Sequence, residues 1–157
     1  MASQREYRAK QLRGALDLWF QAAQLQAERS RDKSASSKVS RIDVNFYVVA
    51  VKRLREAVFH AVQRLDLNDL RSHVEAFDER WPGFAELRNR QEHFRDPVGG
   101  YPSETWYFAG SVVDLKPGGT VVYLVDTDSM SPWIERLYEA GSSALDAEID
   151  RLESRAA

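Results

Sequence analysis

RIDVNFYVVAVKRLREAVFHAVQRL, residues 41–65, determines the fold class because its apolar residues recur every three or four positions. Apolar side chains at this spacing form one stripe along an α-helix. The stripe comprises Phe46, Ala50, Leu54, Ala57, Val58, Ala61 and Leu65. A helix of this kind needs other amphipathic helices against which to bury its stripe, so the segment predicts a helical bundle.

The segments on either side supply such partners. Residues 4–30 carry an apolar stripe of their own, and the Ser-rich stretch that follows them predicts a connecting loop. Helical spacing continues over residues 67–94, where Pro82 predicts a kink or break because proline lacks an amide hydrogen. It stops at Asp96, before a second proline. Ser131-Pro132 predicts the start of a last helix, which runs to about residue 155.

Between the third and fourth predicted helices the periodicity changes. TWYFAGSVVDL (105–115) and TVVYLVD (120–126) are rich in aromatic and β-branched residues, and KPGG lies between them. This pattern is typical of a β-hairpin. We therefore predict an all-α fold: an up-and-down four-helix bundle, residues 1–157 as a single domain, with a β-hairpin inserted at about residues 104–126.

Composition limits the classes of function. The chain has 157 residues, 43% hydrophobic and 29% charged, which is an ordinary globular balance. It has no cysteine, which excludes disulfides, thiolate metal sites and cysteine nucleophiles. No signal peptide or membrane-spanning stretch is recognisable, so we expect a cytoplasmic protein with no membrane partner. A net charge of −2 predicts that any contact with RNA is local.

LRNRQEHFRDPVGG, residues 87–100, contains the residues best suited to catalysis. Asn89 and His93 are four residues apart and share one helix face, whereas Arg88 lies about 140° around the axis from His93. Arginine presents a planar fork to phosphate oxygens, and histidine exchanges protons near neutral pH. The spacing favours a site for phosphate chemistry, with ion pairs to Glu86, Glu92 or Asp96 as the structural alternative.

The chain provides an internal comparison, because Arg55 and His60 have the same spacing. They lie in the middle of a predicted helix, and an acidic residue follows the arginine, so we interpret this pair as structural. The three histidines are far apart and lack partners at a metal-ligand spacing, so we predict neither a metal site nor a cofactor. Trp106, Tyr107 and Phe108 are interpreted as core or interface residues, with base stacking as the alternative.

The Arg-Asn-x-x-x-His pattern resembles the motif of the HEPN superfamily, in which arginine, a polar residue and histidine lie near the end of a bundle helix. The predicted order of four helices extends the resemblance, which is greatest to bacterial abortive-infection and toxin-type members. It implies a metal-independent endoribonuclease with its active sites at a homodimer interface. Carried over by position, Arg88, Asn89 and His93 would be the catalytic residues.

Two functional hypotheses remain open. In the first, the ribose 2′-hydroxyl attacks the adjacent phosphate: Arg88 holds the phosphate, Asn89 orients His93 or the scissile group, and His93 transfers protons. Two chains would supply both imidazoles across a two-fold axis. A toxin of this kind would have a separately encoded antitoxin as a further partner. In the second hypothesis, the same fold is a non-catalytic, dimeric module for nucleotide binding, RNA binding or assembly.

Overall fold

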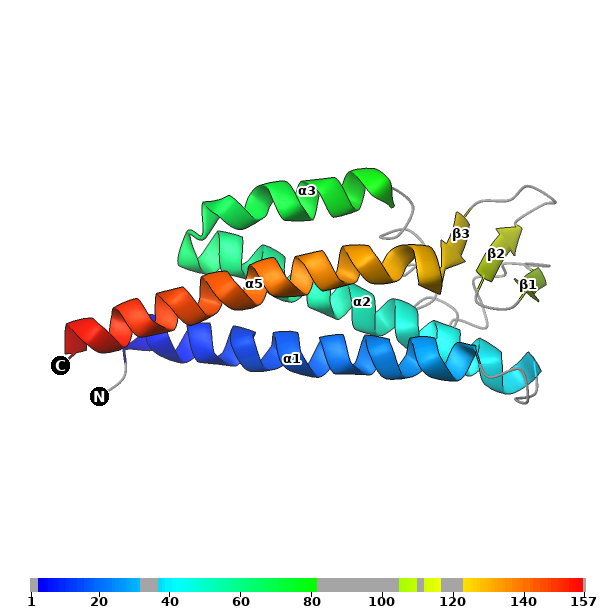
Figure 1. Ribbon diagram of the computed structural model, residues 1–157, viewed down its shortest axis with the longest axis horizontal. Helices are drawn as coiled ribbons and strands as arrows, with labels where there is room; N and C mark the ends of the chain where they lie inside the picture. Colours follow the sequence, from blue (N-terminus) through cyan, green and yellow to red (C-terminus); the bar gives the residue numbers. More distant parts are fainter. Residues whose placement is uncertain (1–2, 32–36, 82–104, 110–111, 117–122, 157) are drawn as a thin grey trace, which may run out of the picture.

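A computed structural model of the protein describes residues 3–31, 37–81, 105–109, 112–116 and 123–156 (Figure 1). The described helices are α1 (Gln4–Ser30), α2 (Ser37–Leu65), α3 (Arg71–Arg80) and α5 (Thr127–Ala156), with a short 3₁₀ turn at Asn68–Leu70. The strands are β1 (Thr105–Ala109), β2 (Val112–Lys116) and β3 (Tyr123–Asp126). The predicted helix over residues 4–30 is confirmed, and the second predicted helix begins four residues earlier than expected.

The long helices α1, α2 and α5 form the body of the protein. α1 packs against both α2 and α5, while the shorter α3 packs on α2 and α5 (Figure 1). α1 begins at a cap in which the Ser3 hydroxyl accepts a hydrogen bond from the amide of Glu6 at 3.1 Å. Along the helix, Phe20 stacks on Tyr138 of α5 with ring centroids 4.0 Å apart. The Tyr138 hydroxyl donates to Asp17 at 2.7 Å, which joins α5 to α1.

The apolar face of α2 forms the centre of the core, and the predicted stripe is confirmed from Ala50 to Leu65. Phe46 was predicted to be buried and is 57% exposed, whereas its neighbour Tyr47 is 1% exposed. The buried side chains described on this helix are Tyr47, Val48, Ala50, Val51, Leu54, Ala57, Val58, Ala61, Val62 and Leu65. Val48 and Val51 widen the apolar face, so an aromatic residue at its edge can remain outside the core.

Gly141 of α5 lies close to side chains of α1 and α2. A Cβ atom at this position would lie 3.0 Å from Leu16 Cδ2 and 3.1 Å from Val58 Cγ2. Gly14 of α1 is the opposite case, because a Cβ atom there would meet nothing within 4 Å. The absent side chain at Gly141 therefore allows α5 to pack closely on α1 and α2.

Replacing Gly141 by valine should lower the free energy of unfolding by about 1–3 kcal/mol, because the added methyl groups overpack the contact between helices. Gly14→Val is the matched control, and we expect it to leave stability within about 0.5 kcal/mol of the parent. Urea unfolding followed by circular dichroism measures both values. Equal stability of the two variants would contradict the close approach of α5.

The chain reverses after α2 through a left-handed residue. Asp66 has a φ of 55°, a conformation that aspartate tolerates better than most residues do. The 3₁₀ turn follows directly, so α3 begins at Arg71 instead of continuing the predicted helix from residue 67. α3 ends at Arg80, before the Trp81-Pro82-Gly83 step at which a break was predicted. Trp81 has left the helical region, as expected of a residue before proline.

The segment between the third and last predicted helices contradicts the predicted fold class. It forms a three-stranded antiparallel sheet in the order β1-β2-β3, so the prediction of an all-α bundle with a two-stranded hairpin is wrong (Figure 1). Phe108 pairs with Val113 and Ala109 with Val112, so the single strand predicted over residues 105–115 is two strands. The predicted pairing across KPGG is present between β2 and β3, where Val113 faces Val125.

The sequence signal for this additional strand was present. Only Gly110 and Ser111 separate β1 from β2 along the chain, and glycine followed by a small polar residue is a common sequence of two-residue hairpins. The apolar residues on both sides made the segment resemble one long strand. The third strand adds a second hydrogen-bonded ladder to the sheet, whereas a lone hairpin is only marginally stable in water.

α5 begins earlier than predicted, at Thr127 directly after β3. Pro132 was expected at the first helical position and instead lies inside the helix. Thr127 and Met130 are both fully buried, so packing of this first turn sets the start of the helix. The Ser131 hydroxyl donates to the Thr127 carbonyl at 2.8 Å within the same turn.

Candidate functional site

Arg88, Asn89 and His93, the residues predicted from the sequence to be catalytic, lie outside the described residues. Their assignment, and the possible ion pairs with Glu86, Glu92 or Asp96, therefore remain predictions. The aromatic triplet at residues 106–108 belongs to β1, which is an edge strand of the sheet.

The comparison pair, Arg55 and His60, is described on α2. Arg55 Nε donates to Asp78 Oδ1 of α3 at 3.0 Å, and a second guanidinium nitrogen contacts the other carboxylate oxygen. The guanidinium carbon also lies 4.9 Å from the centroid of the Phe59 ring. This bidentate ion pair attaches α3 to α2 and occupies the donors that a phosphate would need. The interpretation of Arg55 as structural is confirmed.

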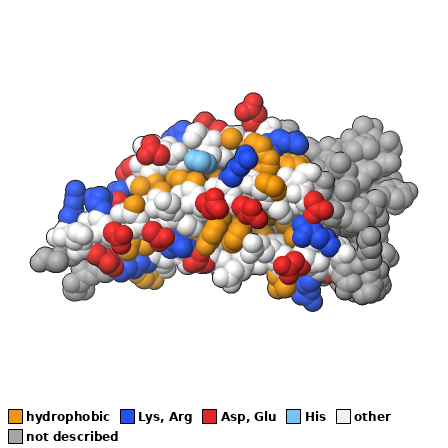
Figure 2. Space-filling view, in the orientation of Figure 1, with side chains coloured by type: hydrophobic (Ala, Val, Ile, Leu, Met, Phe, Trp, Pro, Cys, Tyr) orange, Lys and Arg blue, Asp and Glu red, His pale blue; other side chains and the backbone are white. Residues whose placement is uncertain are grey.

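A groove of about 390 Å³ lies between α3 and α5. Its lining consists of Ser72, His73 and Ala76 from α3 and Trp133, Arg136 and Leu137 from α5. Figure 2 shows a histidine and a basic side chain next to hydrophobic side chains on this face of the molecule. A volume of this size is within the range of small-molecule sites in proteins.

Helical spacing explains why each helix contributes these residues. Trp133, Arg136 and Leu137 are three and four residues apart, so they share one face of α5. Val74 and Phe77 anchor α3 on the bundle at 3% and 1% exposure, and the side chains next to them form the rim of the groove. Leu137 is buried and Ala76 is small, which leaves space between the two helices.

The polar groups of the groove are not engaged with carboxylates. The guanidinium carbon of Arg136 lies 5.5 Å from the centroid of the Trp133 ring. Within the described part of the chain, neither Arg136 nor His73 forms an ion pair or a hydrogen bond, and both side chains are exposed. The groove therefore offers an imidazole and a guanidinium beside an indole ring, groups that together suit an anionic ligand with an aromatic ring.

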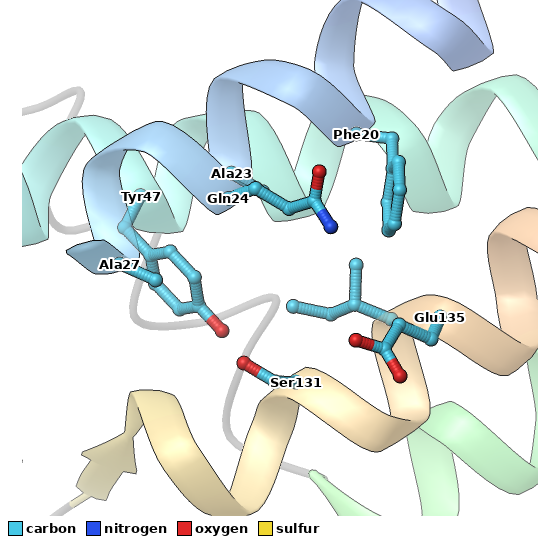
Figure 3. A pocket seen from close by; sticks show the side chains of 8 residues that line it. Phe20, Ala23, Gln24, Ala27, Tyr47, Ser131 and Glu135 are labelled. Atoms are coloured by element: carbon cyan, nitrogen blue, oxygen red, sulfur yellow. The ribbon is translucent and has the colours of Figure 1, made fainter.

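A second hollow, between α1, α2 and α5, is too small for such a ligand. It has about 20 Å³ of free space, enough for roughly one water molecule. Figure 3 shows Phe20 and Ala23 of α1 on one side and Ser131 and Glu135 of α5 on the other. We interpret this hollow as a packing defect of the core.

Among the described residues, the most strongly perturbed carboxylate is Glu148, which belongs to a structural network at one end of the bundle. Its side chain is 6% exposed and accepts hydrogen bonds from Arg151 at 2.7 Å and from Arg5 at 2.6 Å. These two guanidinium groups lower the pKa of Glu148 to about 2. Arg5 also contacts the Leu65 carbonyl, so the network joins the start of α1 to α5 and to the end of α2. A carboxylate with this pKa is a poor proton carrier at neutral pH.

The depressed pKa predicts how stability depends on pH. Because the folded pKa of about 2 lies below the ordinary value of 4.5, the stabilisation is fully present above about pH 4.5 and is lost as the pH falls toward 2. Glu148→Gln should lower the free energy of unfolding at pH 7 by roughly 3 kcal/mol. Urea unfolding should show this difference from the parent shrinking between pH 5 and pH 2. Glu139→Gln on the same helix serves as the control, and an equally large effect there would contradict the assignment.

No protein family, curated protein or solved structure matches this chain. Over the described residues, no three His, Asp or Glu side chains lie close enough together to hold a metal ion. No helix among them has the length and apolar character needed to cross a membrane.

The groove residues were not found from the sequence. His73 was considered only as a metal ligand, and Trp133 and Arg136 only as part of the last helix. The spacing of Trp133 and Arg136 was visible, but their proximity to His73 depends on how α3 packs on α5. No local pattern in a single sequence carries that information.

Proposed function

We propose that the protein is a metal-independent endoribonuclease that cleaves RNA through attack of the ribose 2′-hydroxyl on the adjacent phosphate. The observation that carries the proposal is the sequence Arg88-Asn89-x-x-x-His93, which resembles the HEPN motif. The proposal rests on this motif and not on the fold, since the chain also contains a three-stranded sheet. Cleavage in the cytoplasm, as a toxin or defence protein with a cognate antitoxin, is part of the same proposal.

The proposed roles follow from the chemistry of the reaction. A base must accept the proton of the 2′-hydroxyl, a positive charge must stabilise the pentacoordinate phosphorane, and an acid must protonate the leaving 5′-oxygen. Arg88 contributes the charge through its bidentate fork, and Asn89 orients His93 or the scissile group. Each chain has one histidine in the motif, so a homodimer with both motifs at the two-fold axis supplies a base and an acid to one phosphate.

The state of Arg55 favours Arg88 and His93 as the catalytic pair. Both pairs have the same spacing, so spacing alone does not identify a site. The carboxylate of Asp78 occupies Arg55, which removes this copy from consideration as a phosphate site. The Arg88 copy is the pair that is left, and it includes the asparagine that the superfamily motif favours.

The alternative of a non-catalytic binding module has a specific observation in its favour. The chain has a net charge of −2, whereas proteins that bind RNA over a wide surface usually carry a basic patch. This module would bind RNA or nucleotide without cutting it. It predicts the same dimer but no change in the length of the RNA.

Incubation of the purified protein with RNA in EDTA tests the proposal. We expect shortened RNA ending in a 2′,3′-cyclic phosphate, and no effect of the chelator. The His93→Ala protein, purified in the same way, is the control for contaminating nucleases. Intact RNA at every protein concentration would reject the proposal in favour of the binding module.

A further inference from the structure

We propose that the groove between α3 and α5 binds one nucleotide of single-stranded RNA, with the phosphate at Arg136 and the base stacked beside Trp133. The choice of RNA as the ligand rests on the proposed function, whereas the groove itself is defined by described residues. Binding a nucleotide that does not flank the cleaved bond would hold the RNA strand on the protein.

The guanidinium of Arg136 is available to a ligand. Several arginines of the bundle are neutralised, among them Arg55 by Asp78 and Arg13 by Asp146 at 2.9 Å. No described carboxylate lies within ion-pair distance of Arg136, so its in-plane N–H donors have no described acid to bind. The His73 imidazole lines the same groove and adds a hydrogen-bonding group for phosphate oxygens.

Trp133 provides an aromatic surface next to Arg136. Trp133 is partly exposed, and the guanidinium of Arg136 lies over its ring. Bases in single-stranded RNA stack on aromatic rings and on arginine planes alike, so a base can extend this pair. The plane of the guanidinium serves the base while its edge serves the phosphate. Leu137 and Ala76 provide an apolar surface beneath the base.

The volume of the groove and the charge of the protein both agree with a single nucleotide as the ligand. A groove of about 390 Å³ accommodates a nucleotide but not a folded RNA helix, so the ligand is a single-stranded residue. A site with one arginine and one histidine also agrees with the overall charge of −2, which permits a local contact and not a broad one. An acidic peptide would use the cation but would leave the indole without a partner.

The test measures binding apart from cleavage. The His93→Ala protein in EDTA is titrated into a fluorescein-labelled ten-nucleotide single-stranded RNA, and the anisotropy gives Kd. Arg136→Ala and Trp133→Leu, each added to His93→Ala, should raise Kd roughly tenfold. Arg155→Ala removes the same charge from the same helix far from the groove and should leave Kd within about twofold. Circular dichroism verifies that each variant is folded, and the exposed Arg136 can be replaced even if Trp133→Leu is unstable.

Competition identifies the chemistry of the ligand. Adenosine 5′-monophosphate should displace the labelled RNA at lower concentration than adenosine or ribose 5-phosphate does, because only the nucleotide has both base and phosphate. Equal competition by inorganic phosphate would overturn the nucleotide assignment, as would equal Kd values for Arg136→Ala and Arg155→Ala. Binding that is lost in the groove variants of a protein that never cuts RNA would reject the proposed function and leave this site intact.

Discussion

Replacing His93 by alanine is expected to reduce the rate of RNA cleavage by about 10²–10⁴-fold, which is the usual contribution of a positioned acid or base. The protein should still bind RNA, because the imidazole acts on the proton of the 2′-hydroxyl or of the leaving oxygen. Arg88→Lys should also lose most of the activity, since a point charge does not reproduce the bidentate fork. Initial rates on a labelled RNA in EDTA measure both effects.

The internal comparison pair provides the control for this experiment. His60→Ala removes a histidine that is five residues after an arginine, as His93 is, but this arginine is bound to Asp78. We expect His60→Ala to cut RNA at close to the parent rate, provided that it is folded at the assay temperature. Equal activity of His93→Ala and the parent would end the catalytic assignment. Equal losses in His60→Ala and His93→Ala would indicate that folding, and not proton transfer, had been affected.

Mixing two inactive variants is expected to restore part of the activity. Arg88→Ala and His93→Ala chains each lack one catalytic group, and a mixed dimer contains one intact copy of each. The mixed site has one arginine and one histidine where the parent has two of each, so refolding the two proteins together should yield weak cleavage that neither shows alone. Light scattering on the same samples gives the oligomeric state. A monomeric parent protein that cuts RNA would contradict the composite site.

A dimer formed through the exposed surface of α1 has to be distinguished from one formed through the Arg88–His93 motif. Tyr7, Leu18 and Leu25 of α1 are 60%, 60% and 50% exposed, and Leu18 and Leu25 are seven residues apart on one helix face. A dimer formed through this surface would dissociate in Leu18→Lys. The composite site instead predicts that Leu18→Lys remains dimeric and active, because the motif and not α1 lies at the two-fold axis.

The helices were predictable because their signal is local. Apolar spacing located α1 and the end of α2 at Leu65, and the proline rule located the end of α3. The failures have physical causes. Phe46 fits the spacing of the core stripe but is exposed, because Tyr47 and Val48 fill the core at this end of α2. α5 begins before its proline because burial of Met130 outweighs the preference of proline for a first turn.

The candidate site residues also differ in whether a local sequence pattern reveals them. A motif within six residues, such as Arg88 to His93, can be recognised from the sequence because its spacing is local. The groove of His73 and Arg136 depends on the packing of two helices that are far apart along the chain. A single sequence does not encode that proximity in any local pattern. The division into β1 and β2 was missed for a different reason, because Gly110-Ser111 lies between two apolar runs that together resemble one strand.

The central claim is that the ribose 2′-hydroxyl is the nucleophile and that no metal ion takes part. A DNA oligonucleotide with one internal ribonucleotide, incubated with the parent protein in EDTA, tests it most directly. The account predicts a single cut directly 3′ to the ribonucleotide, leaving a 2′,3′-cyclic phosphate and a 5′-hydroxyl. Cleavage of the all-DNA control, a 5′-phosphate product, or activity that appears only when a divalent metal is added would contradict it.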